Sequence, residues 1–170
     1  MSEPIVIVEY DPAWPLLFEE EKARILAVAG SYSQDIRHIG STAVPGLGAK
    51  PIIDMMIGLM YLALVEKCVQ PLESLGYKYR GEYGIPGRHY FHKKQDGLAT
   101  HHIHMVEKGS DFWNRHLLFR NYLRTHPEDA RQYYLLKKKL ADKFGSDHEG
   151  YTDAKAKFIE AILTTALLDE

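Results

Sequence analysis

The first third of the chain combines an extended lead with an amphipathic helix. Ile5 to Val8 is a β-branched run, which predicts a short strand or an extended arm. Asp11-Pro12 predicts a helix start, because an acidic cap followed by proline suits the first turn. Apolar residues then recur at helical spacing from Trp14 to Val28, and Gly30 ends the pattern. The acidic residues Glu19, Glu20 and Glu21 are expected mostly on the solvated side of this helix.

Short runs that are rich in β-branched and aromatic residues predict the strands of a sheet. They occupy residues 36–39, 52–57, 77–82, 88–94 and 100–107. Gln95-Asp96-Gly97 separates the last two runs and is typical of a hairpin turn through its Asp-Gly pair. The pattern predicts a mixed sheet of about four to six strands.

Helical spacing returns at residues 61–75, between the second and third of these strands. Pro71 removes a backbone donor and restricts the residue before it, so we expect this helix to break at Gln70. Gly76 closes the segment.

The last third of the chain is predicted to be helical throughout. Ser110-Asp111 caps a first helix, and Thr125 or His126 caps a second that ends near Gly145. A final helix covers residues 154–166. The basic run around Lys137 lies near the negative, C-terminal end of the dipole of the second helix. The favourable interaction with that dipole is sufficient to explain why these residues are basic. We therefore expect an α/β (or α+β) fold in which the sheet has flanking helices and a C-terminal helical cap.

Composition indicates an ordinary globular chain. It has 170 residues, 45% of them hydrophobic and 26% charged, so we expect one domain covering residues 1–170. A net charge of −2 gives no global basic bias, which makes nucleic acid an unlikely partner. The single cysteine, Cys68, excludes an internal disulfide and fits a reducing compartment. Without a signal pattern or an apolar run of about 18 residues, we expect no membrane association and a cytoplasmic location.

The segment from Arg37 to Leu59 concentrates the residues that suggest chemistry. A hydrophobic strand ending in Gly40-Ser41-Thr42 brings bare backbone and hydroxyl donors to the place where a phosphate would bind. Lys50 adds positive charge, and Asp54 lies within the apolar run Ile52 to Ile57. Because a carboxylate in such a strand must be paired, hydrogen-bonded or bound to a cation, Asp54 is a candidate site residue. The alternative is a structural ion pair with Lys50, Arg37 or Arg88.

The same segment carries a family resemblance. Its glycine-serine turn, its VPGL loop and its KPIID strand resemble the GrpB family of the nucleotidyltransferase-like superfamily. The resemblance continues through HHIHMVEKGSDFWNRHLLFRNYLRTHPEDA to YTDAKAKFI. It implies a mixed, twisted sheet of the nucleotidyltransferase-like type and, for an enzyme, nucleotidyl transfer. In GrpB-like chains a YxxAK segment recurs, which marks Lys155 as a residue to expect near the cleft. Fusions of the family to dephospho-CoA kinase imply a link to coenzyme A or to nucleotides.

The sequence departs from the superfamily pattern at its acidic residues. Met56 stands where a metal-dependent nucleotidyltransferase has a second acid, and the strand expected to carry a third acid has histidines at positions 101, 102 and 104. Two magnesium ions need several carboxylate oxygens, and Asp54 alone supplies too few. Either the chemistry is built around imidazole, or metal-catalysed transfer has been lost.

Strand alternation places His102 and His104 on one face, with His101 facing the other way. Two imidazoles at this spacing suit a transition metal with Asp54 as third ligand, and they equally suit a phosphate. A divalent cation (Mg, Mn or Zn) is thus a candidate cofactor held by Asp54, His102 and His104. Arg88 on the neighbouring strand adds a planar guanidinium that can donate two parallel hydrogen bonds to a phosphate.

Three hypotheses follow from these residues. In the first, the chain binds a nucleotide or another phosphorylated small molecule, and if it is an enzyme, it is a nucleotidyltransferase with a divergent metal site. Asp54, His102 and His104 are its catalytic residues, and Gly40, Ser41, Thr42, Lys50, Arg88 and Lys155 bind the ligand. In the second, the site is degenerate and the domain is a non-catalytic ligand or partner module. In the third, the histidines and Asp54 form a metal-dependent hydrolase. The pattern leaves the oligomeric state open.

Overall fold

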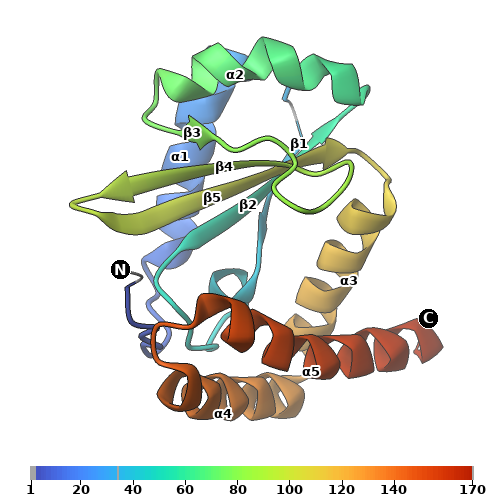
Figure 1. Ribbon diagram of the computed structural model, residues 1–170. Coiled ribbons are helices and arrows are strands. Elements are labelled where there is room, and N and C mark those ends of the chain that lie inside the picture. Colours follow the sequence, from blue (N-terminus) through green and yellow to red (C-terminus); the bar gives the residue numbers. More distant parts are fainter. Residues whose placement is uncertain (1–2, 34, 170) are drawn as a thin grey trace.

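The protein is described by a computed structural model that covers residues 3–33 and 35–169. A five-stranded mixed sheet forms its centre, with the strand order β1-β2-β5-β4-β3 (Figure 1). Strands β2 and β5 are parallel, and the other neighbours are antiparallel. The strands are β1 (Asp35–Ile39), β2 (Ile53–Leu59), β3 (Lys78–Tyr79), β4 (His89–Gln95) and β5 (Leu98–Glu107). The predicted mixed sheet is confirmed.

Helices cover the sheet unequally. Two α-helices pack on one face, and three others form a C-terminal layer in which α3 leads away from the sheet toward α4 and α5 (Figure 1). The helices are α1 (Trp14–Ala29), α2 (Val65–Glu73), α3 (Asp111–Thr125), α4 (Pro127–Phe144) and α5 (His148–Leu168), with short 3-10 turns at Ser41–Ala43 and Leu62–Leu64. None of the helices within residues 3–33 and 35–169 has the length and apolar character needed to cross a bilayer.

Strand alternation divides the apolar side chains of β2 and β5 between two cores. Met55, Ile57, Ile103 and Met105 face α1 and α2 in the main core. On the opposite face, Met56 packs with Ile39, Val106 and Trp113 beneath the start of α3. A one-residue change in register would exchange the two faces, so this burial pattern fixes the side on which the polar residues of both strands emerge.

Local signals in the sequence set several element boundaries. The Asp11 carboxylate accepts a hydrogen bond from the backbone of Ala13 just before α1, and the Ser110 hydroxyl accepts one from Trp113 at the start of α3. Asp96 and Gly97 both have positive φ, 52° and 81°, which is the backbone of the predicted tight hairpin.

The predicted break of α2 at Gln70 is wrong, because the helix continues through Pro71 to Glu73. Pro71 lies so close to the end of the helix that its missing donor affects the last turn alone. The buried side chains of Cys68 and Leu72 hold that turn in the core. The third strand is also shorter than predicted, since it ends at Tyr79.

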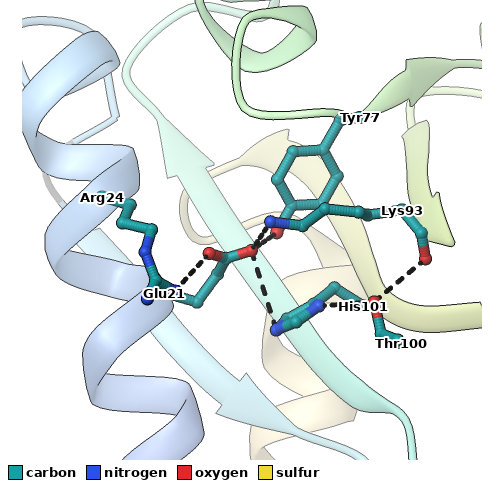
Figure 2. Close-up of polar contacts among 6 residues, drawn as sticks. All are labelled: Glu21, Arg24, Tyr77, Lys93, Thr100 and His101. Atoms are coloured by element: carbon teal, nitrogen blue, oxygen red, sulfur yellow. Dashed lines mark hydrogen bonds and ion pairs between the residues drawn. The ribbon is translucent and has the colours of Figure 1, made fainter. Parts of the chain in front are cut away.

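Glu21 is completely buried, which corrects its predicted place on the solvated side of α1. Its carboxylate accepts a hydrogen bond from Tyr77 at 2.5 Å and pairs with Lys93 at 2.5 Å and Arg24 at 3.2 Å (Figure 2). His101 Nε2 lies 3.6 Å from the same carboxylate, on the sheet face opposite His102 and His104. This Glu21 cluster ties α1 to β4 and β5. Burial alone would raise the pKa of Glu21, but hydrogen bonds from Lys93 and Tyr77 outweigh it and hold that pKa below its usual value.

We expect Glu21→Gln to destabilise the fold by about 2 kcal/mol, because it leaves the Lys93 ammonium beside a neutral group. A depressed pKa means that wild-type stability is present above the unfolded pKa of 4.5 and is lost as pH falls below it. The variant should therefore show a weaker decline in stability below that pH. Urea unfolding across an acid pH series measures both effects. Equal slopes for the two proteins would contradict the role given to Glu21.

Candidate functional site

The register of the sheet brings three predicted site residues together. Asp54 on β2 pairs with His102 on the parallel strand β5, and His104 lies two residues further along the same face. The Asp54 Oδ1 atom lies 3.0 Å from His104 Nε2 and 3.6 Å from His102 Nδ1. Burial alone would raise the pKa of Asp54, but hydrogen bonds from both imidazoles outweigh this effect and hold that pKa well below its usual value. About a third of the side chain, 32%, stays exposed, so a ligand can reach this charged carboxylate.

Gly40 lies next to Asp54, because it follows Ile39, the residue of β1 that pairs with Asp54. Its backbone has φ 73° and ψ −174°, a region that is essentially restricted to glycine. A Cβ at Gly40 would lie 3.0 Å from Asp54 Oδ2 and 3.2 Å from Asp54 Cβ. Gly40, which the sequence predicts to allow close approach of a phosphate, therefore also leaves the space that the Asp54 carboxylate occupies.

Gly40→Ala should destabilise the protein by about 2 kcal/mol, because it adds backbone strain and a contact with the carboxylate. Gly46→Ala is the matched control, since Gly46 also has positive φ, 82°, but a Cβ there would have no heavy atom within 4 Å. Thermal unfolding of both variants separates the two causes. If Gly40→Ala is no more damaging than Gly46→Ala, the close packing against Asp54 is unimportant.

The two hydroxyls after Gly40 have different surroundings. Thr42 is buried and donates to the Ile52 carbonyl at 3.1 Å, so it accepts a hydrogen bond from His38 Nε2 at 2.9 Å. Burial lowers the pKa of His38 to about 4, which leaves the ring neutral and able to make this contact. Thr42 thus shapes the turn, and its hydroxyl is already engaged. Ser41 is less buried and contacts the hydroxyl of Tyr133.

Arg88 enters the site from the start of β4 and is 6% exposed. Its Nη1 lies 3.0 Å from His104 Nδ1, and its Nη2 donates to the carbonyls of Glu82 and Tyr83. The guanidinium also lies 5.0 Å from the Tyr90 ring centroid. These contacts fix the planar cation against the sheet.

Three lysines lie near one another, one in the loop before β2 and two on the C-terminal helices. Lys50 Nζ and Lys155 Nζ lie 5.0 Å and 4.5 Å from the Tyr151 ring centroid. Lys137 is 2% exposed and donates to the Gly48 carbonyl at 2.6 Å. Burial, with repulsion from neighbouring lysines, lowers the pKa of Lys137 to about 6 and that of Lys155 to about 8. Burial also lowers the pKa of Lys50, which Asp54 partly opposes.

These groups surround one cavity of ≈ 540 Å³ between the sheet and the C-terminal helices. All nine predicted site residues line it: Gly40, Ser41, Thr42, Lys50, Asp54, Arg88, His102, His104 and Lys155. Asp54 is the one carboxylate among the described lining residues, which include five lysine and arginine side chains: Lys50, Arg88, Arg115, Lys137 and Lys155. Arg115 pairs with Glu160 on α5. The cleft therefore carries a clear positive excess.

The sequence interpretation missed Lys137, Tyr133 and Tyr151 as cavity residues. Lys137 was attributed to the helix dipole, yet it continues an apolar stripe on α4 that begins at Tyr133 and includes Leu140. A lysine on a buried stripe was the signal that could have identified it. Arg120 and Arg124 donate to the carbonyls of His38 and Ala43 and brace the turn after β1.

The donor set does not form the metal site predicted from Asp54, His102 and His104. Within residues 3–33 and 35–169, no group of three His, Cys, Asp or Glu side chains is arranged to hold a metal ion. Met56, at the position of a second acid, is fully buried among Ile39, Val106 and Trp113. These residues do not fit the paired magnesium ions of metal-dependent nucleotidyl transfer, which need several oxygen ligands.

The architecture is a nucleotidyltransferase-like fold. It aligns with the Cid1 poly(U) polymerase bound to MgGTP at a TM-score of 0.54, with 10% identity, over 80% of this chain and 44% of that one. This likeness concerns the fold alone.

The chain belongs to the GrpB family, whose model, described as GrpB protein, matches residues 4–165. The crystal structure of conserved protein GrpB from Enterococcus faecalis is 38% identical and aligns at a TM-score of 0.89, over 96% of this chain and 98% of that one. UPF0157 protein YqkA of Bacillus subtilis (strain 168) is 42% identical over 156 residues, which make up 92% of this chain and 45% of YqkA. The chain thus spans about half of that relative. The resemblance drawn from the glycine-serine turn and the KPIID strand is confirmed.

Proposed function

We propose that the cleft binds a nucleotide or another phosphorylated small molecule. The observation that carries the proposal is the positive excess of the cavity, where Lys50, Arg88 and Lys155 lie with a single carboxylate. The other two basic residues add less charge at pH 7, because the pKa of Lys137 is about 6 and Arg115 pairs with Glu160. Partial burial strengthens electrostatic attraction, because the local dielectric is lower than that of water. Burial, and after it repulsion between the lysines, lowers the pKa of Lys137 and Lys155, and a phosphate chain would relieve the repulsion. Neither an uncharged nor a cationic ligand would do so.

Aromatic residues at the cavity favour a nucleotide over inorganic phosphate. Tyr83 stacks on Tyr90 with ring centroids 5.4 Å apart and an interplanar angle of 14°. Tyr83 is 58% exposed, so a planar base can contact the part of its ring that Tyr90 and the Arg80 guanidinium, 4.9 Å from the ring centroid, leave open. Ile85 and Phe119 add apolar lining. The combination matches a ligand with one planar apolar part and one anionic part.

Each predicted ligand-binding residue has a role in this proposal. Gly40 and Ser41 border the phosphate position, while Lys50, Arg88 and Lys155 supply charge. Thr42 acts indirectly, since its hydroxyl is engaged with His38 and Ile52. His102 and His104 lie on the sheet side of the cavity with Asp54. We propose binding and not transfer as the primary activity, because one carboxylate is too few for the usual metal-dependent reaction.

Calorimetric titration tests the proposal. The probes are ATP, GTP, UTP, AMP, dephospho-CoA and inorganic tripolyphosphate, each in magnesium and in EDTA, with adenosine as the uncharged control. At least one phosphorylated probe should bind while adenosine does not, and triphosphates should bind more tightly than AMP. Failure of every phosphorylated probe would contradict the proposal and favour a non-catalytic partner module. Binding of zinc or manganese with the appearance of hydrolysis would favour the hydrolase hypothesis instead.

A further inference from the structure

The hydrogen bonds around His104 have only one consistent assignment. A guanidinium has donors and no acceptor, so Arg88 Nη1 donates to His104 Nδ1 across 3.0 Å. An imidazole whose Nδ1 accepts is neutral and carries its proton on Nε2. That nitrogen lies 3.0 Å from Asp54 Oδ1 and therefore donates to it. Burial lowers the pKa of His104, which agrees with a neutral ring.

In these contacts the Nδ1 lone pair of His104, which a metal ion would need, accepts a hydrogen bond from Arg88. A metal-binding histidine offers an unprotonated nitrogen, and both nitrogens of His104 are already engaged. The second oxygen of Asp54 faces the close-packed backbone of Gly40. The one carboxylate of the described cavity lining thus has one oxygen hydrogen-bonded to His104 and the other next to Gly40, while 32% of its side chain remains exposed.

We propose that Asp54 is a positioning residue, which holds Arg88 through the neutral Nε2–H tautomer of His104, and that the cleft binds its phosphorylated ligand without a divalent cation. The inference rests on the proposed function and specifies how the same site works. Arg88 and the lysines supply the positive charge that a metal would otherwise bring. Asp54 needs only to accept a hydrogen bond, and its negative charge is not required.

Two substitutions separate positioning from metal ligation. Asp54→Asn keeps an oxygen that accepts a hydrogen bond from His104 and removes the charge, whereas Asp54→Ala removes both. We expect ATP and tripolyphosphate to bind wild-type protein with dissociation constants that agree within about threefold in EDTA and in magnesium. Asp54→Asn should bind equally or more tightly, because a negative charge next to the phosphates is lost. Asp54→Ala should bind about tenfold more weakly than Asp54→Asn.

A ligand-independent readout protects the test if a variant folds poorly. A long-range proton–nitrogen NMR spectrum of the imidazoles, with His104 assigned by its loss in His104→Gln, should show Nδ1 unprotonated and Nε2 protonated. A proton on Nδ1, or a requirement for magnesium that disappears in Asp54→Asn, overturns the inference while leaving the proposed function intact. If neither ATP nor tripolyphosphate binds in any buffer, the proposed function fails, and the NMR spectrum still decides the state of His104.

Discussion

Arg88→Met is expected to weaken ATP binding about 100-fold, because it removes a buried cation that lines the proposed binding cleft. Arg88 is 6% exposed and is held by two backbone carbonyls and by His104, so no other residue can take its place without rearrangement. Arg88→Lys keeps the charge but loses the planar fork and should fall between the wild-type protein and Arg88→Met. Calorimetric titration in EDTA measures all three affinities.

Arg80→Met is the matched control for this prediction. Arg80 stacks on Tyr83 at 4.9 Å from the same loop but does not line the cavity. Its substitution should change ATP affinity by less than about threefold, as expected for a charge outside the site. If Arg80→Met and Arg88→Met weaken binding equally, the effect belongs to the fold of the loop and the role of Arg88 is contradicted.

Lys155→Met is expected to have two opposite effects, about 30-fold weaker ATP binding and a melting temperature about 2–4 °C higher at pH 7. The unliganded cleft holds several amino groups close together, so removing one relieves repulsion. Burial and the Lys50 charge already lower the pKa of Lys155 to about 8. Lys157→Met, an exposed position on the same helix, is the control and should alter neither quantity. A loss of both stability and binding in Lys155→Met would contradict this account.

The stabilisation by Lys155→Met should depend on pH in a defined direction. Because the folded pKa of Lys155 lies below its unfolded value of 10.5, the unfolded chain binds more protons between about pH 8 and 10.5. The wild-type protein therefore gains stability as pH rises through this window. The difference between variant and wild type should be greatest at or below pH 7 and should shrink toward pH 10.5.

Alternation along the strands made much of the sheet side of the cleft predictable. A period of two places His102 and His104 on one face, and the apolar residues between them identify that face as the one opposite the main core. Gly40 and Asp54 were also predicted to meet, since the glycine turn ends the strand next to the one that carries the acid. Local pattern was sufficient because the first conclusion concerns one strand and the second concerns two strands that are consecutive in the sequence.

The helical side of the cleft was less predictable because it depends on how distant segments pack. Lys137 reaches the Gly48 carbonyl across 89 residues of sequence, and nothing local to either residue specifies that contact. Glu21 is a different case, because its spacing from Phe18 and Ile25 already places it on the buried stripe of α1. Its charge suggested solvent, whereas Tyr77, Lys93 and His101 supply its partners from distant segments.

The most direct test of the central claim is a crystal structure of the protein soaked with ATP in the presence of EDTA. The account predicts phosphate density in the cleft, between Arg88 on β4 and Lys155 on α5, with no metal bound at Asp54. ATP bound at another surface, or a cleft without ligand density under conditions in which ATP binds in solution, would contradict it.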